Sequence, residues 1–235
     1  MKSNLGARMT AEFLGTAFLA AAVVGSGIMG ERLANGNTAL ALLANAIATG
    51  AALVALILAF GPISGAHFNP VVSLADAMEG GLSWPDAFSY ITAQLFGGIS
   101  GTIAAHAMFG LALVSRSHHV REGPEQGLSE FIATFGLLCV IWGCSRSHAR
   151  VVPFAVGSYI TAAYWFTAST SFANPAVTIA RSLTDTFSGI RPNDVPLFIA
   201  AQIGGGVAAT FLFRRLIPGL PSGAKDVVMP HKNES

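Results

Sequence analysis

The sequence has little charge. Lys, Arg, Asp and Glu make up 11% of the 235 residues, against about 25% in a typical soluble domain. Apolar residues make up 52% of the chain, and the mean hydropathy is +0.59. The formal net charge is only +1, which gives no broad basic surface for nucleic acid. This composition argues against a soluble domain and indicates an integral membrane protein.

Cysteine is scarce as well. The two cysteines, Cys139 and Cys144, are five residues apart in one apolar run, so a helix places them on different faces. That spacing indicates neither a disulfide framework nor a metal pair. The sequence also shows no nucleophile–base pair, no cluster of metal ligands and no phosphate-binding loop. We therefore expect no enzyme, no cofactor and no metal site.

Long apolar runs are what the sequence does contain. Six are long enough to span a bilayer, which takes about 17–25 residues. They lie near residues 9–29, 38–60, 86–111, 128–145, 151–168 and 195–217. The first run carries Glu12 and lacks a small-residue cleavage site, so we expect a helix there and not a signal peptide. Six spans put both termini on one side, and most of the Lys and Arg residues fall on that side, which favours cytoplasmic termini.

Three short sequence signatures occur twice, in the same order. Residues 11–16 match residues 129–134, an Asn-Pro motif follows in each half, and residues 92–98 match residues 200–205. Since each half holds three spans, the halves must have opposite orientations in the bilayer, which is an inverted repeat. Within a single domain over 1–235 we predict repeats at 8–111 and 127–217, a connector at 112–126 and a flexible cytoplasmic tail at 218–235.

The two Asn-Pro motifs are Asn69-Pro70-Val71 and Asn174-Pro175-Ala176. Each opens an apolar stretch that is too short for a full span. Asn at the cap and Pro at the first helical position are helix start signals, so each stretch is expected to be a half-helix that re-enters the membrane. Irregular backbone at that depth is tolerated only where protein or a watery cavity surrounds it. The two half-helix N-termini should meet near mid-membrane, each carrying about half a positive charge.

These features resemble the aquaporin and glycerol-channel superfamily, the major intrinsic proteins. The resemblance covers roughly residues 8–217 and depends on the doubled motif, the paired glutamates and the run from Ser64 to Pro70. It implies an all-α membrane protein in which six transmembrane helices and two re-entrant half-helices form a channel domain with one narrow pore. It also implies a homotetramer embedded in membrane lipid.

The resemblance assigns roles to individual residues. Asn69 and Asn174 are expected to direct their amides into the pore, where an amide can donate to a passing oxygen while its carbonyl is held by its own half-helix. Glu12 and Glu130 are expected to hold the re-entrant loops by hydrogen bonds to the backbone. His67 matches a pore-lining histidine, and we expect its ring to be packed and neutral.

The chain departs from the family at the narrowest ring of the pore, the selectivity filter. The family normally has an arginine three residues after the second Asn, and this chain has Val177. Counting by the family's spacing gives the other three members as Thr49, Ala162 or Ala163, and Ser171 or Phe172. Losing the arginine removes a fixed cation and five hydrogen-bond donors. We therefore expect a wide ring of modest polarity that passes larger neutral solutes.

Two charged residues near the mouths have more than one interpretation. Arg181 is four residues past Val177 and shares its helix face. It caps the C-terminus of the half-helix, pairs with Asp185, or reaches back to supply a displaced filter charge. Asp76 is the counterpart of Arg181 in the first half, seven residues past its Asn, and is expected to be a solvated residue at the inner mouth.

The run from Asn174 to Arg181 resembles a bacterial subgroup, the aquaporin S type, that is associated with arsenic-resistance genes. The resemblance implies a passive channel of the cell inner membrane for arsenite-like metalloid hydroxides and glycerol-like polyols, with some water. The alternatives are an ordinary water channel, an ion-coupled secondary transporter and a membrane protein that conducts little. Only Glu12, Glu130 and Asp76 are candidate acids for ion coupling, and the two glutamates are expected to be scaffold.

Overall fold

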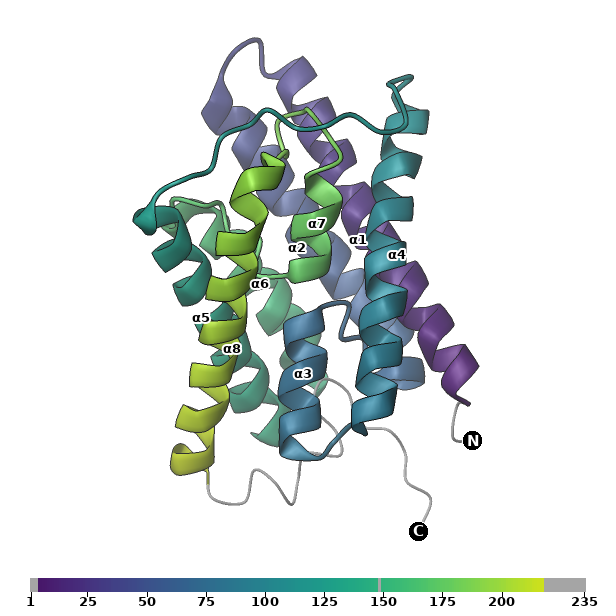
Figure 1. Ribbon diagram of the computed structural model, residues 1–235, viewed down its shortest axis with the longest axis vertical. Helices are drawn as coiled ribbons and strands as arrows, with labels where there is room; N and C mark the ends of the chain where they lie inside the picture. The colour runs from purple at the N-terminus through teal and green to yellow at the C-terminus, as the bar shows by residue number, and fades with distance from the viewer. Residues whose placement is uncertain (1–3, 148, 218–235) are drawn as a thin grey trace.

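The computed structural model describes residues 4–147 and 149–217. Every regular element in these residues is a helix (Figure 1). The α-helices are α1 (Leu5–Leu33), α2 (Thr38–Ser64), α3 (Pro70–Glu79), α4 (Trp84–Met108), α5 (Pro124–Ser147), α6 (Val152–Phe166), α7 (Pro175–Arg181) and α8 (Val195–Leu216). Two short 3-10 turns, η1 (Ala149–Val151) and η2 (Pro192–Asp194), precede α6 and α8. The predicted tail at 218–235 lies outside the described residues.

The six longer α-helices run along the long axis of the molecule, and the two short ones, α3 and α7, lie among them (Figure 1). α3 begins near mid-height and runs to one end, whereas α7 begins near mid-height and runs to the other. Each therefore covers only part of the molecule's length, as the doubled motif predicts. The start of α1 and the end of α8 lie at the same end.

Length and composition alone identify fewer spans than the six predicted. Among the described residues, four helices are both long and apolar enough to cross a membrane: Leu5–Leu33, Thr38–Ser64, Pro124–Ser145 and Pro192–Leu216. α6 has 15 residues, about 22 Å at 1.5 Å per residue, because Val151 belongs to the turn η1 and the helix ends at Phe166. α4 has 25 residues but buries polar side chains such as Gln94 and His106, which lower its hydropathy.

The repeated glycines mark where the helices of each half approach most closely. A Cβ atom at Gly97 of α4 would lie 2.4 Å from the carbonyl oxygen of Phe13 in α1. A Cβ atom at Gly205 of α8 would likewise lie 2.4 Å from the carbonyl oxygen of Phe131 in α5. The two halves thus pack their first and last helices in the same way, and only a residue without a side chain fits at each crossing.

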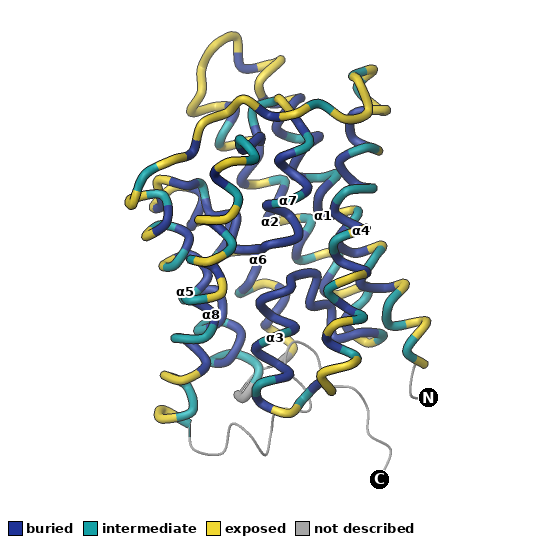
Figure 2. The backbone as a smooth tube through the Cα atoms, viewed as in Figure 1, coloured by how far each residue is buried: buried dark blue, intermediate teal, exposed yellow. Residues whose placement is uncertain are grey.

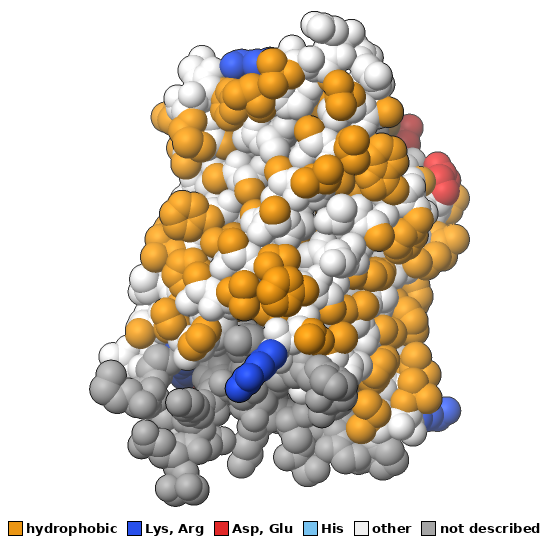
Figure 3. Space-filling view, turned by 180° about the vertical axis from the view of Figure 1, so that it is seen from behind, with side chains coloured by type: hydrophobic (Ala, Val, Ile, Leu, Met, Phe, Trp, Pro, Cys, Tyr) orange, Lys and Arg blue, Asp and Glu red, His pale blue; other side chains and the backbone are white. Residues whose placement is uncertain are grey.

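Burial separates the half-helices from the outer surface. Figure 2 shows most of α3 and α7 buried, and Figure 3 shows hydrophobic side chains spread over the face turned away from the viewer in Figure 1. Phe18, Phe88 and Phe96 are each about 60% exposed. Large apolar side chains exposed over a whole face are typical of a surface that contacts a membrane or another protein.

Candidate pore

The two Asn-Pro motifs adopt the same cap structure. Asn69 is the N-cap of α3, and its side-chain oxygen accepts a hydrogen bond from Val71 N at 3.0 Å. Asn174 is the N-cap of α7, and its side-chain oxygen accepts from Ala176 N at 3.0 Å and from Val177 N at 3.3 Å. Each side-chain carbonyl is therefore held by its own half-helix, so the amide nitrogen faces away from that helix.

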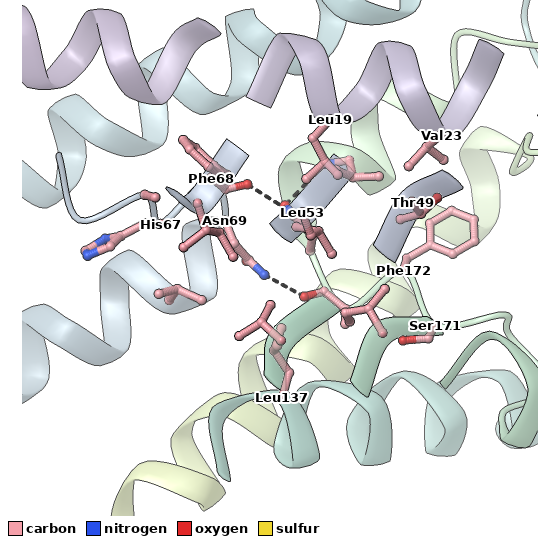
Figure 4. Close-up of a pocket in the computed structure, with 18 of the residues that line it drawn as sticks. Leu19, Val23, Thr49, Leu53, His67, Phe68, Asn69, Leu137, Ser171 and Phe172 are labelled. Atoms are coloured by element: carbon pink, nitrogen blue, oxygen red, sulfur yellow. Dashed lines mark hydrogen bonds between the residues drawn. The ribbon is translucent and has the colours of Figure 1, made fainter. Parts of the chain in front are cut away.

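Each asparagine also bonds to the opposite loop, as the dashed lines in Figure 4 show. Asn69 Nδ2 donates to the carbonyl oxygen of Ala173 at 2.7 Å, and Asn174 Nδ2 donates to the carbonyl oxygen of Phe68 at 2.8 Å. These reciprocal bonds join the two half-helix starts at the centre of the molecule. A primary amide carries two hydrogens, so one N–H on each asparagine is left for a solute.

Glu12 of α1 lies behind the first of these loops. Its carboxylate accepts from the backbone nitrogens of His67 and Phe68, at 3.0 and 2.7 Å, and from the hydroxyl of Ser64 at 2.6 Å. Gln94 Nε2 adds a further bond at 2.7 Å. A carboxylate with this many donors is satisfied even though it is fully buried.

Glu130 of α5 repeats the arrangement behind the second loop. Its two oxygens accept from Phe172 N and Ala173 N, both at 2.8 Å, and from Gln202 Nε2 at 2.6 Å. This is the backbone-holding geometry expected of a scaffold. A proton carrier needs a carboxylate that is free to change its protonation state, and here each oxygen already accepts at least one hydrogen bond.

These glutamate bonds hold a backbone that non-glycine residues rarely adopt. Ala66 and Phe68 in the first loop have φ of 51° and 49°, and Ser171 and Ala173 in the second have φ of 50° and 48°. A left-handed conformation costs such residues roughly 1 kcal/mol each. The pairs occupy matching positions in the two repeats, so the backbone strain is a shared structural feature of the two loops. Nothing in the residue types signals it.

A cavity of about 640 Å³, including the part open to solvent, runs past both asparagines. Its walls come mainly from apolar side chains of α1, α2, α5 and α6, and its polar atoms come from the two loops. Figure 4 places His67 at one end of the cavity and Thr49, Ser171 and Phe172 at the other. An apolar tube with a few polar groups along it is the arrangement found in small-molecule passages and sites.

At the second end, the structure brings together most of the predicted filter residues. Thr49, Ser171, Phe172 and Val177 all line the cavity. Both loop candidates are therefore present, and no choice between Ser171 and Phe172 is needed. Ser171 Oγ is buried and has no hydrogen-bond partner within the described residues, so it is available to a solute.

The predicted member from α6 is wrong. Ala162 is exposed on the outer side of the helix, and Ala163 is buried away from the cavity. Counting back from Asn174 failed because the count does not determine which face of α6 turns inward. The face that lines the cavity carries Val156, Ile160 and Tyr164, whose four-residue spacing is a helical stripe that could have revealed it. Tyr164 OH lies 3.1 Å from Thr49 Oγ1.

Comparison with known proteins identifies the family. The model of the major intrinsic protein family matches residues 2–171 and 145–234. The chain belongs to the major intrinsic protein family. It is therefore a multi-pass membrane channel and not an enzyme, and its all-helical fold is that of this family.

Individual relatives agree with this assignment. The chain is 56% identical over 214 residues to aquaglyceroporin AqpS of Rhizobium meliloti, covering 91% of each chain. It is 32% identical to aquaporin A of Dictyostelium discoideum, covering 88% of this chain and 77% of the relative. Among solved structures it resembles the aquaglyceroporin from Plasmodium falciparum, with a TM-score of 0.70, 19% identity and coverage of 92% and 99%. The structural match shows the fold alone.

The first Asn-Pro motif of this major intrinsic protein ends in Val71, where the second motif has the smaller Ala176. Val71 is buried but does not line the cavity. Its Cγ1 occupies the space beside Gly206 of α8, where an added Cβ would lie 2.2 Å away. A glycine on the neighbouring helix therefore accommodates the extra methyl groups.

Arg181 also lines the cavity, at the end that holds Thr49 and Phe172. Its side chain is 2% exposed, its Nε donates to the carbonyl oxygen of Ser188, and its guanidinium carbon lies 3.3 Å from the centroid of the Phe172 ring. The expected pairing with Asp185 is wrong. Asp185 instead accepts from His118 N at 2.8 Å and faces His118 Nδ1 at 2.9 Å, and these bonds lower the pKa of its carboxyl.

The connector contributes a second arginine that sequence reasoning missed. Arg121 is 8% exposed and donates to the carbonyl oxygens of Gly189 and Ser169, at 2.8 and 3.0 Å. Its guanidinium lies 5.0 Å from the Phe172 ring centroid. Burial lowers the pKa of Arg121 to about 10, which leaves it charged at neutral pH. A single arginine in a polar connector carries no pattern that distinguishes it from a solvated one.

At the end of the cavity opposite Thr49 and Phe172, the position of Asp76 differs from the prediction. His67 lines it, with Nδ1 3.0 Å from Ser73 Oγ. Asp76 is 5% exposed and its Oδ2 lies 3.5 Å from His67 Nε2, so it is not a solvated mouth residue. Asp76 is on the face of α3 that turns inward and packs beside the histidine.

Proposed function

We propose that this chain is a passive channel for small neutral solutes, with arsenite-like metalloid hydroxides and glycerol-like polyols as its main cargo and some water passing as well. The observation that carries the proposal is the composition of the cavity where Val177 lies. Ile160, Phe172 and Val177 give it an apolar side, while Thr49, Tyr164 and Ser171 supply hydroxyl groups. A solute with a small apolar body and several hydroxyls matches both kinds of surface.

The name of the Rhizobium relative, an aquaglyceroporin, supports glycerol as a solute. The resemblance to the arsenic-associated subgroup supports arsenite, which is an uncharged trihydroxy molecule at neutral pH. The ring is more aromatic than the sequence predicted, because Tyr164 replaces an alanine in it. It is still without the arginine at position 177 that would narrow it and favour water alone.

The rest of the assembly follows from the family resemblance. We propose a homotetramer in the lipid of the cell inner membrane, with both termini cytoplasmic, and with inverted repeats at 8–111 and 127–217 joined by the connector at 112–126. Asn69, Pro70, Asn174 and Pro175 are assigned to the central constriction, with Glu12 and Glu130 as the scaffold of its loops.

The test is stopped-flow light scattering on proteoliposomes with water, glycerol and arsenite. The wild type is expected to pass all three without an ion gradient. Val177→Arg is expected to lose glycerol and arsenite and keep water, because a guanidinium would fill the ring. Val114→Arg, on a residue that is 53% exposed in the connector, is the matched control and should behave as the wild type.

Each alternative has its own outcome. Flux of water alone through the wild type would identify an ordinary water channel. Uptake that needs an ion gradient and stops with a protonophore would identify a coupled transporter. Equal solute fluxes through Val177→Arg and the wild type would show that Val177 does not determine selectivity.

A further inference from the structure

We propose that Arg181 provides the positive charge at the end of the cavity that holds Thr49 and Phe172, one helical turn beyond the position where the family places an arginine. This inference rests on the proposed channel function and names the residue that excludes cations from it.

Arg181 lies along the same part of the passage as Val177. Val177 and Arg181 are four residues apart on α7, so they share a face and lie about 6 Å apart along the axis. Both line the same cavity. A long side chain at position 181 can therefore extend to the part of the passage that a side chain at position 177 borders.

The side chain is also fixed in place. Arg181 is 2% exposed, its Nε donates to the carbonyl oxygen of Ser188, and its guanidinium stacks on the ring of Phe172. Phe172 is itself packed edge-on against Phe198, with ring centroids 5.1 Å apart. An arginine held by a carbonyl and an aromatic face keeps its planar fork in one orientation, as a selectivity element requires.

The charge of Arg181 is only partly offset by a carboxylate, since Glu130 attracts it from a distance without contacting it. Among the described residues it forms no ion pair, and the nearest candidate in sequence, Asp185, is bonded to His118 instead. Arg121, the other guanidinium near Phe172, adds charge of the same sign. In a low-dielectric surrounding such a charge acts strongly on an ion in the passage, so cations are repelled while neutral solutes are not.

Neighbouring groups complete a place where a polyhydroxy solute can bind. Ser171 Oγ lacks a partner among the described residues, and the hydroxyls of Thr49 and Tyr164 lie together in the lining. The guanidinium only donates, whereas these hydroxyls both donate and accept. A solute with several hydroxyls therefore finds both kinds of partner at this level.

The experiment measures methylammonium, a small cation, and glycerol in proteoliposomes. Arg181→Gln removes the charge and keeps a donor for Ser188, whereas Arg181→Lys keeps the charge. We expect Arg181→Gln to raise methylammonium permeability by at least about tenfold with glycerol flux retained, and Arg181→Lys to exclude the cation as the wild type does. Arg116→Gln, at an exposed arginine of the connector, is the matched control and should change neither flux.

A second variant tests the same idea without removing the arginine. Val177→Glu places a carboxylate one turn from Arg181, where the pair can neutralise each other, and is expected to admit methylammonium. The neutral variant Val177→Gln is expected to exclude it. If Arg181→Gln does not fold, the comparison of Val177→Glu with Val177→Gln still tests whether the charge of Arg181 excludes cations.

The outcomes separate this inference from the proposed function. Methylammonium exclusion by both folded Arg181→Gln and Val177→Glu would overturn the role of Arg181, whatever the glycerol flux. A wild type that passes no glycerol would overturn the proposed function, while a cation leak confined to the charge-neutralised variants would still support Arg181.

Discussion

At the scale of single residues, the channel depends on buried carboxylates that make no ion pair among the described residues. Glu12 and Glu130 are each fully buried and accept only hydrogen bonds, mostly from the backbone of the loop beside them. Bonds to a charged acceptor are stronger than neutral ones, which suits loops whose own conformation is strained. Each glutamate thus offsets the cost of the left-handed residues that bring an asparagine to the centre.

Replacement of Glu130 is expected to destabilise the protein strongly. Glu130→Ala leaves Phe172 N, Ala173 N and Gln202 Nε2 without their acceptor, and each buried unsatisfied group costs about 1–3 kcal/mol. The loss in free energy of unfolding should therefore reach at least about 3 kcal/mol, seen as a lower thermal midpoint in detergent. Glu122→Ala, which removes an exposed pair with Arg191, is the control and should leave the thermal midpoint nearly unchanged, because exposed ion pairs contribute little to stability. Equal midpoints for the two variants would contradict the scaffold role.

At the scale of elements, close helix approach determines where glycine is required. α5 and α8 cross at Gly205, as α1 and α4 cross at Gly97, with the partner's backbone carbonyl in the place of a side chain. Backbone cannot move aside as a side chain can. Gly97 and Gly205 of the repeated signature are therefore required by the packing of the helices.

Two adjacent glycines allow a matched test of this packing. Gly205→Ala puts a Cβ 2.4 Å from Phe131 O, whereas Gly204→Ala meets its nearest atom, on the Phe131 ring, at 3.5 Å. Overpacking costs about 1–3 kcal/mol, so Gly205→Ala should lower the thermal midpoint. Gly204→Ala should leave it unchanged or raise it, because alanine favours a helix by about 1 kcal/mol over glycine. A reversed order of midpoints would show that this crossing is looser than described.

At the scale of the whole molecule, two similar halves meet where their half-helices begin. The reciprocal bonds of Asn69 and Asn174 link the halves at the centre, and Arg214 of α8 bonds Glu79 and the carbonyl oxygen of Met78 in α3. The half-helix of one repeat is thus tied to the last helix of the other. With an odd number of long helices per half, the connector must lie at the opposite end from the start of α1.

Reporter fusions test the orientation of the whole molecule. A fluorescent protein that matures only in the cytoplasm, fused after α8, is expected to fluoresce in bacterial cells. Alkaline phosphatase, active only outside the cytoplasm, is expected to work when the chain is truncated and fused within the connector at 112–126. The reverse fusions, with each reporter at the other site, should be inactive. Active phosphatase at the end of α8 would contradict cytoplasmic termini.

The amino-acid sequence alone was enough to predict the family, the long and short helices and the repetition of one design in two halves. These follow from local signals: apolar runs, cap residues and repeated motifs, each readable within a few positions. The asparagine caps and the glutamates that bond the loops come from the same motifs.

The side chains that line the passage, and the position of its charge, depend instead on how the helices and loops pack together. Tyr164 lines the cavity and Ala162 does not, because the rotation of α6 about its axis depends on its packing against other helices. Arg181 faces the cavity, where the carbonyl oxygen of Ser188 and the ring of Phe172 hold its side chain. Arg121 reaches the same region from the connector and bonds to the carbonyl oxygens of Gly189 and Ser169. Such choices depend on contacts between residues distant in the chain, which residue type and spacing do not encode.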